Sequence, residues 1–220
     1  MRLSKETIAL LKNFNSISNH LRVHPGNELS IMSGGGSIFA KVTVAETFPT
    51  EFCIHDLTSF LSILSYMNNE EIEFGENSLK ISFNGSTIEY RYSEPSTIIA
   101  PPAGKSINVD VYYQFAISAA DIIMLSKASG ITGAQFIVLK SKDNNVTLEV
   151  GNEESGIIQS KQIGVSPLTF NALVPVESFN GKIIPATYTV TLSKMKFLHF
   201  SPADQGVPEY WLALNPKSVV

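Results

Sequence analysis

Much of the chain alternates between apolar and polar residues with a period of two, which is typical of half-buried β-strands. A run over 79–83 alternates in this way, the dipeptide Asn84-Gly85 supplies a two-residue turn, and a second alternating run follows over 88–92. The pattern therefore predicts a hairpin at 79–92. It predicts further strands at 29–32, 38–44, 136–139, 146–150, 187–192 and 210–214, separated by turns such as Gly34-Gly35-Gly36 and Asp143-Asn144-Asn145.

Four short segments have helical spacing instead, with apolar residues gathered on one face. The spacing predicts helices over about 4–15, 56–68, 118–129 and, more weakly, 176–181. Ser4 and Asp56 are suited to cap the first two helices. Ser118 and Asp121 have the spacing of a capping box, and Gly130 is a natural stop for the third helix.

The first and third helical segments are related to each other, which indicates a degenerate duplication. Leu3-Ser4 aligns with Ile117-Ser118, so that apolar positions of the first helix fall on apolar positions of the third. A stretch rich in proline and small residues lies between the two halves. We therefore expect an N-terminal domain over 1–94, a connector over 95–106 and a C-terminal domain over 107–220.

The composition excludes several classes of protein. The chain has 220 residues, of which 44% are hydrophobic and 16% charged, enough for a substantial core and too apolar for a disordered chain. No apolar run approaches the ~18 residues that would cross a bilayer, and the first residues lack the apolar stretch of a signal peptide, so we expect the chain to stay where it is made. The single cysteine, Cys53, excludes a disulfide scaffold and a thiolate metal cluster, and it fits a reducing compartment.

The charge balance argues against a protein that grips nucleic acid with an overall basic surface. The formal net charge is −4, from 16 basic and 20 acidic residues. The distribution of the charges matters more than their sum, however, so a local basic surface remains possible.

The chain carries little that predicts catalysis. His55-Asp56 is the most tempting pair, but neighbours in sequence point in different directions and no nucleophile motif accompanies them. The triple glycine at 34–36 precedes a predicted strand and lacks the lysine of a phosphate loop. His20 and His24 are four residues apart without a third ligand at useful spacing. We therefore expect no catalytic residues, no metal and no cofactor.

Several stretches nevertheless resemble a known family. They are 3–14 (LSKETIALLKNF), 56–64 (DLTSFLSIL) and 95–101 (PSTIIAP), and they are similar, in order and position, to stretches of the sliding clamp of T4-type bacteriophages, the polymerase processivity factor. The closing 209–214 (EYWLAL) is similar to the last strand of trimeric clamps. The resemblance covers nearly the whole chain.

The resemblance implies an α+β DNA-clamp fold, with two similar domains that each pack two helices on antiparallel sheets, assembled as a ring of three subunits. Double-stranded DNA would pass through the ring without sequence-specific contacts. The partners would be a DNA polymerase and an ATP-dependent clamp loader, at replication forks in the cytoplasm of an infected bacterium. The protein would not be an enzyme and would not engage a membrane.

A clamp needs only a few basic side chains towards the DNA, since each neutralised phosphate adds salt-dependent grip that slows sliding. The expected DNA-facing residues are Arg2, Lys5 and Lys12 around the first helix, Lys127 at the end of the third and Lys182 at the end of the fourth. The alternative is that these lysines lie on solvated helix faces without a DNA role. The second helix has no basic residue on its polar face.

The family also implies a peptide pocket and a closing interface. The pocket positions match Ile98 and Ile99 in the connector, with Tyr210, Trp211 and Leu212 as further walls. The alternative is that Ile98 and Ile99 only fasten the connector to its own domains. The strands expected to pair between subunits are 87–92 and roughly 155–165.

Two other classes of protein compete with the clamp. A β-rich structural virion protein could use duplicated domains as an assembly surface without DNA passing through it. A hydrolase is less supported, because the nucleophile and metal constellations are missing.

Overall fold

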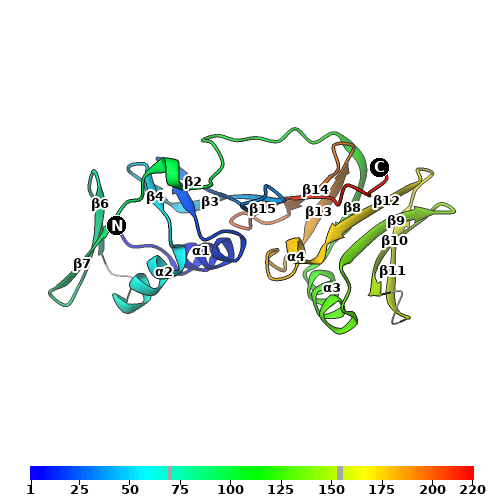
Figure 1. Cartoon of the computed structure of the whole chain (residues 1–220), viewed down its shortest axis with the longest axis horizontal. Helices are drawn as coiled ribbons and strands as arrows, with labels where there is room; N and C mark the ends of the chain where they lie inside the picture. Colours follow the sequence, from blue (N-terminus) through cyan, green and yellow to red (C-terminus); the bar gives the residue numbers. More distant parts are fainter. Residues whose placement is uncertain (69–70, 153–155) are drawn as a thin grey trace. The chain divides into compact units, whose positions relative to one another are not determined.

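The computed structural model describes residues 1–68, 71–152 and 156–220 and divides into two compact units. Unit 1 contains residues 1–34 and 39–105, and unit 2 contains residues 35–38 and 106–220 (Figure 1). Each unit combines helices with antiparallel strands. Within the described ranges, no helix is long and apolar enough to span a membrane.

Unit 1 contains two helices, which lie side by side in Figure 1, and a short 3₁₀ turn. The helical elements are α1 (Lys5–Ile17), α2 (Leu57–Tyr66) and η1 (Pro95–Thr97). The strands are β1 (Leu21–Val23), β2 (Gly26–Met32), β3 (Ile38–Phe48), β4 (Phe52–Ile54), β5 (Glu71–Phe74), β6 (Ser78–Phe83) and β7 (Ser86–Arg91).

Unit 2 contains the helices α3 (Ala119–Thr132) and α4 (Val176–Phe179). Its strands are β8 (Val111–Ile117), β9 (Phe136–Lys142), β10 (Asn145–Asn152), β11 (Ile157–Val165), β12 (Phe170–Pro175), β13 (Tyr188–Ser193), β14 (Phe197–Pro202) and β15 (Glu209–Ala213).

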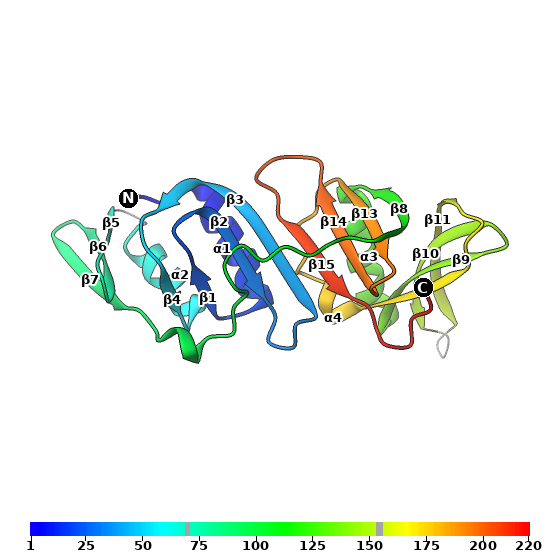
Figure 2. The same ribbon diagram turned by 90° about the horizontal axis from the view of Figure 1, so that it is seen from above.

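Neighbouring strands pair antiparallel in both units (Figure 2). In unit 1, β2 pairs with β3, β1 pairs with β4, and a third sheet has the order β5-β6-β7. In unit 2, one sheet has the order β15-β14-β13-β8 and the other β11-β10-β9-β12. Each of β7 and β11 is therefore the last strand of its sheet, with one edge that no described strand of the chain pairs.

The local sequence signals explain the turns. The predicted hairpin at 79–92 is confirmed as β6 and β7, with Phe83 opposite Ser86. Asn84 and Gly85 have φ angles of 48° and 78°, so both turn residues adopt the left-handed region that asparagine and glycine tolerate. Asp143 and Asn144, at 52° and 64°, form the matching turn between β9 and β10.

The caps confirm three of the predicted helix starts. The Ser4 hydroxyl accepts the Thr7 N–H at 3.1 Å, and the Asp56 carboxylate accepts the Ser59 N–H at 3.0 Å. Ser118 and Asp121 form a reciprocal capping box at α3. Each cap thus accepts one of the N–H groups that have no intrahelical partner at the start of a helix.

The predicted end of the third helix was wrong. Gly130 lies inside α3, which continues to Thr132 and ends at Gly133, where φ is 66°. Either glycine could have stopped the helix, and the chain stops at the one that adopts the left-handed conformation. The predicted fourth helix is a single turn that ends at Phe179.

Each unit has its own apolar core between helices and sheet. In unit 1, Leu11 and Phe14 of α1 and Leu57 of α2 are buried. In unit 2, Ile122 and Leu125 of α3 are buried in the same way. The aligned positions Leu11 and Leu125 both face a core, as the predicted duplication requires.

Candidate nucleic-acid interface and connector

The position of α1 is fixed by a carboxylate from the sheet. Glu46 on β3 accepts the hydroxyl proton of Thr7 at 2.6 Å through Oε2, and its Oε1 accepts the backbone N–H of Ser4. Burial raises the pKa of Glu46, but the hydrogen bonds from Thr7 and Ser4 outweigh that effect and lower it below its usual value. The carboxylate thus holds a negative charge at the positive end of the α1 dipole.

Lys5 and Lys12 lie on one exposed face of the helix that Glu46 holds. They are seven residues apart, which is close to two helical turns. Among the residues that the structure describes, no acidic side chain pairs with either lysine. Arg2 is also exposed and precedes the helix. Unit 1 therefore brings together the three basic residues predicted around its first helix.

An open groove lies between the exposed faces of α1 and α2. Its volume is about 490 Å³, and Lys12 is the one basic residue that lines it. The Asn15 amide donates to the Thr58 hydroxyl at 3.0 Å across the groove. The remaining lining residues are Leu61, Ser62, Ser65 and Tyr66. This surface can offer hydroxyl and amide groups to a ligand, with a single positive charge.

Of the two basic residues predicted in unit 2, one is placed differently from the expectation. Lys127 is exposed but lies in the middle of α3, because the helix continues to Thr132. Lys182 is partly buried and lies in the turn after α4, where its N–H donates to the carbonyl of Phe179 at 3.1 Å. Lys127 therefore does not lie at the end of its helix as predicted, whereas Lys182 follows the end of α4 by three residues, and the DNA-facing role of both stays a prediction. The exposed face of α3 also carries Ile123 and Ile131, and Lys127 is its one lysine, whereas α1 exposes Lys5 and Lys12.

The connector begins with η1 and then runs along unit 1. Ile98 is partly buried, whereas Ile99 is 46% exposed. The backbone N–H of Ile99 donates to Nδ1 of His20 at 3.3 Å. Further along, Lys105 lies 5.4 Å from the centroid of the Phe39 ring, at cation–π distance. The connector is thus attached to unit 1 at several points while one of its isoleucines stays exposed.

The other predicted pocket residues lie on β15 in unit 2. Tyr210 and Leu212 are completely buried, and Trp211 is 6% exposed. The Tyr210 hydroxyl accepts the N–H of Ile184 at 3.3 Å, and burial raises its pKa. These three side chains contribute to the core of their own unit. The peptide pocket itself stays a prediction.

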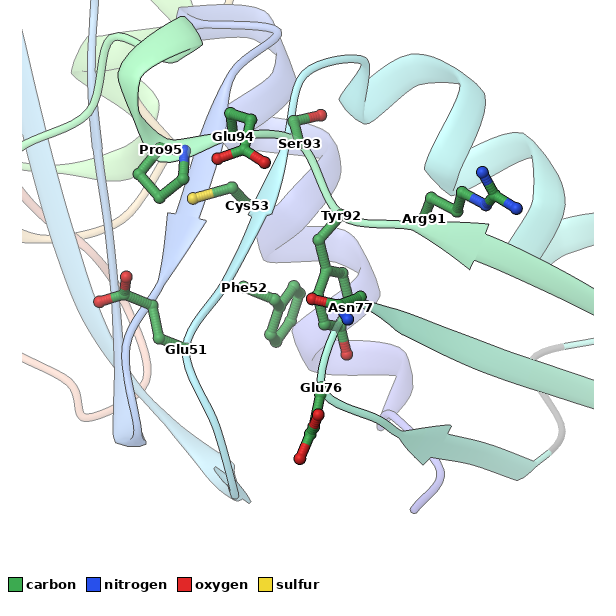
Figure 3. Close-up of a pocket in the computed structure, with 10 residues that line it drawn as sticks. All are labelled: Glu51, Phe52, Cys53, Glu76, Asn77, Arg91, Tyr92, Ser93, Glu94 and Pro95. Carbon is green, nitrogen blue, oxygen red and sulfur yellow. The ribbon is translucent and has the colours of Figure 1, made fainter.

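A pocket of about 350 Å³ lies where β7 leads into the connector (Figure 3). Phe52 and Tyr92 stack at its base with their centroids 5.4 Å apart, and Ser93 donates its N–H to the carbonyl of Cys53 at 3.0 Å. Glu51, at the rim, is engaged by Arg22 and His24, which lower its pKa. The pocket therefore lies where the connector begins.

The remaining sequence candidates serve the fold. His55 packs on His20 with centroids 4.5 Å apart, while Asp56 caps α2, so the pair His55-Asp56 does not act together. His24 contacts Glu51 at 2.8 Å. The triple glycine lies in the turn between β2 and β3, as predicted.

Comparison with known proteins gives the family. No protein-family model matches the chain. The sliding clamp of Escherichia phage RB69 is 30% identical over 202 residues, which cover 87% of this chain and 87% of that protein. The chain belongs to the sliding-clamp family. The sliding clamp of Enterobacteria phage T4 is 28% identical over 215 residues, covering 96% of this chain and 92% of that protein.

Solved structures identify the same fold at much lower identity. PCNA from A. fulgidus, solved with the C-terminal region of FEN-1, has a TM-score of 0.72 at 13% identity and covers 99% of this chain and 98% of that chain. The PCNA2-PCNA3 complex from Sulfolobus tokodaii has a TM-score of 0.69 at 11% identity, covering 98% and 99%. The predicted DNA-clamp fold and the resemblance to clamps of T4-type phages are confirmed, and nothing in these comparisons favours a virion protein.

Proposed function

We propose that this clamp assembles as a homotrimeric ring around duplex DNA and holds a replicative DNA polymerase on its template. The observation that carries the proposal is the similarity to the RB69 phage sliding clamp over 87% of both chains. The clamp would act at replication forks in the infected bacterium, loaded by an ATP-dependent partner and without a catalytic activity of its own. The proposed domains are 1–94 and 107–220, joined by the connector 95–106.

The proposed DNA-facing surface is the shared face of α1 and α2. Lys5 and Lys12 are exposed, and no described acidic residue neutralises them, so both charges are available to phosphates. The groove beside them is lined mainly by neutral hydroxyl and amide groups, which can contact phosphates without releasing counterions. Two lysines beside neutral polar groups support contacts to DNA that are weak enough for the clamp to slide. Arg2, Lys127 and Lys182 are proposed as lesser contributors.

Ring closure is proposed between β7 of one subunit and β11 of the next. Both strands end their sheets, and both carry exposed backbone edges over several residues. Such edges pair readily with another chain. The predicted strand 155–165 begins at Ser155, which lies outside the described residues, and the described strand starts at Ile157.

The connector is proposed as the contact for peptide tails of polymerase and loader. Ile99 supplies an exposed apolar side chain in a segment held against unit 1. Such a side chain on an extended segment offers an apolar surface that a bound peptide would cover.

The first experiment tests the ring. Light scattering should give about three times the 24.0 kDa mass of the chain, and the protein loaded onto a nicked circular plasmid should be retained during gel filtration. Linearising the plasmid should release it, because a ring slides off a free end. A monomer at all concentrations, or equal retention on linear and circular DNA, would refute the ring.

The second experiment tests the surface. Lys5→Glu with Lys12→Glu should leave the trimer intact but impair loading and processive synthesis. The matched control is Lys142→Glu with Lys217→Glu, which makes the same charge change at exposed positions outside the helices. Equal processivity of the two double variants would remove Lys5 and Lys12 from the DNA surface.

A further inference from the structure

A pair of histidines lies under the connector of this clamp. Nδ1 of His20 accepts the backbone N–H of Ile99 at 3.3 Å, across 79 positions of sequence. The His20 ring also packs on His55, with centroids 4.5 Å apart and a 31° angle between the ring planes. His20 is therefore in contact with both the connector and the segment that leads into α2.

The backbone that carries His20 is itself fixed. The carbonyl of Asn19 accepts the N–H of Leu57 at 2.9 Å, and its side-chain oxygen accepts the N–H of Thr58 at 3.0 Å. His20 also donates its own N–H to the Ser18 hydroxyl at 3.1 Å. The backbone of His20 is consequently held at the start of α2, and its imidazole is a fixed acceptor for the connector.

The hydrogen bond requires one protonation state. A neutral imidazole accepts at Nδ1 only when its proton is on Nε2, and an imidazolium has no acceptor at all. Protonation of His20 would therefore turn the acceptor that faces the Ile99 N–H into a second donor. It would also place a positive charge against the His55 ring.

We propose that His20 is the positioning residue of the connector: in its neutral form it fixes the backbone at Ile99, and on protonation it releases it. This inference rests on the proposed role of the connector as the contact for partner peptides, because a fixed Ile99 presents the isoleucine side chain in one place. Peptide capture by the clamp would then weaken when His20 is protonated.

Among the described residues, the ionisable groups linked to this contact are His55 and Asp56. The connector contributes a backbone N–H, and the segment before α2 contributes His55. Asp56 is linked to His20 through the neighbouring Asn19, whose side-chain amide donates to the Asp56 carboxylate at 3.2 Å. The same carboxylate caps α2.

The test uses the full-length clamp and three variants. His20→Leu removes the acceptor, whereas His20→Asn places a carbonyl oxygen close to the position of Nδ1 but cannot be protonated. His55→Phe keeps a ring packed on His20 and leaves the acceptor in place. Amide hydrogen exchange at Ile99, expressed as protection relative to the free peptide rate, is measured between pH 5 and 8.

The wild type and His55→Phe should both protect the Ile99 amide at pH 8. Protection should be lower by roughly three- to tenfold in His20→Leu, the range expected for one net hydrogen bond. The wild type should lose protection in acid, and His20→Asn should keep it throughout. Unchanged protection in His20→Leu, or an acid loss in His20→Asn equal to that of the wild type, would overturn the proposal.

A binding measurement separates this inference from the proposed function. The probe is a synthetic peptide of the C-terminal tail of the phage's own DNA polymerase. Binding several-fold weaker to His20→Leu than to wild type and His20→Asn supports the positioning role, and equal binding to all three overturns it. If wild type does not bind the peptide at all, the connector is not the partner site, and the exchange data alone then decide whether His20 holds it.

Discussion

Replacing Glu46 by alanine should destabilise the clamp through the start of α1. The side chain accepts two hydrogen bonds, from the Ser4 N–H and the Thr7 hydroxyl, and Thr7 is 1% exposed. Hydrogen bonds to a charged group contribute about 1.5–3 kcal/mol each. Because Glu46 is only partly buried, we take the lower end of this range and expect a loss of about 3 kcal/mol in the free energy of unfolding.

The assay is urea unfolding followed by far-ultraviolet circular dichroism, at one fixed subunit concentration because assembly contributes to stability. The control is Glu6→Ala, which removes an exposed carboxylate from the first turn of the same helix. Its loss of a favourable dipole contact, about 0.3–1 kcal/mol, is partly offset by the helix propensity of alanine.

The pH dependence gives a second measure of the same interaction. The pKa of Glu46 is lowered in the folded protein, so its stabilising effect is fully present above the unfolded value of 4.5 and is lost as the pH falls through the folded value. The difference between wild type and Glu46→Ala should therefore shrink in acid. A loss below about 0.5 kcal/mol at pH 7, or a difference that does not change in acid, would refute the assignment of Glu46 as the anchor of α1.

Two further predictions concern α3. Gly133→Ala should destabilise the clamp by about 1 kcal/mol, because Gly133 has a φ of 66°. Gly130→Ala should stabilise it by about as much, because Gly130 lies in the helix interior. Both changes are measured by urea unfolding, and changes of the same sign would contradict the assigned helix end. Asp121→Ala removes the capping box and the ion pair with Lys161, and it should lower the free energy of unfolding by about 1–2 kcal/mol. The control is Asp110→Ala, which should cost less than about 0.5 kcal/mol, because Asp110 pairs with Lys194 at 4.0 Å and their side chains are 52% and 59% exposed. Equal losses would show that the cap does not stabilise α3.

The sequence predicted the elements whose signals are local. Ser4, Asp56 and Ser118 cap helices as expected, because a cap and its N–H partner lie three residues apart. The hairpin of β6 and β7 followed from Asn84-Gly85 and the flanking alternation. The strands β1 and β4, with three residues each, are too short to show a period and were missed.

The site residues that sequence reasoning missed depend on contacts between distant segments. Glu46 lies 39 positions from Thr7, and His20 lies 79 positions from Ile99, so neither pairing leaves a pattern within a local window. The groove lined by Lys12 depends on the packing of α1 against α2, although the lack of basic residues on α2 was visible in the sequence. Lys127 was predicted at a helix end because the end of α3 was placed too early, near Gly130.

The edges of β7 and β11, which no described strand pairs, also determine whether an assembly has a direction. β7 and β11 belong to different sheets and differ in sequence, so a junction between them is head to tail rather than two-fold symmetric. A ring closed through such junctions repeats every subunit by rotation about one axis, and its front and back are then different surfaces. All copies of the connector lie on equivalent positions with respect to that axis. A polymerase that binds one face of such a ring would thereby distinguish the two directions of travel along a duplex.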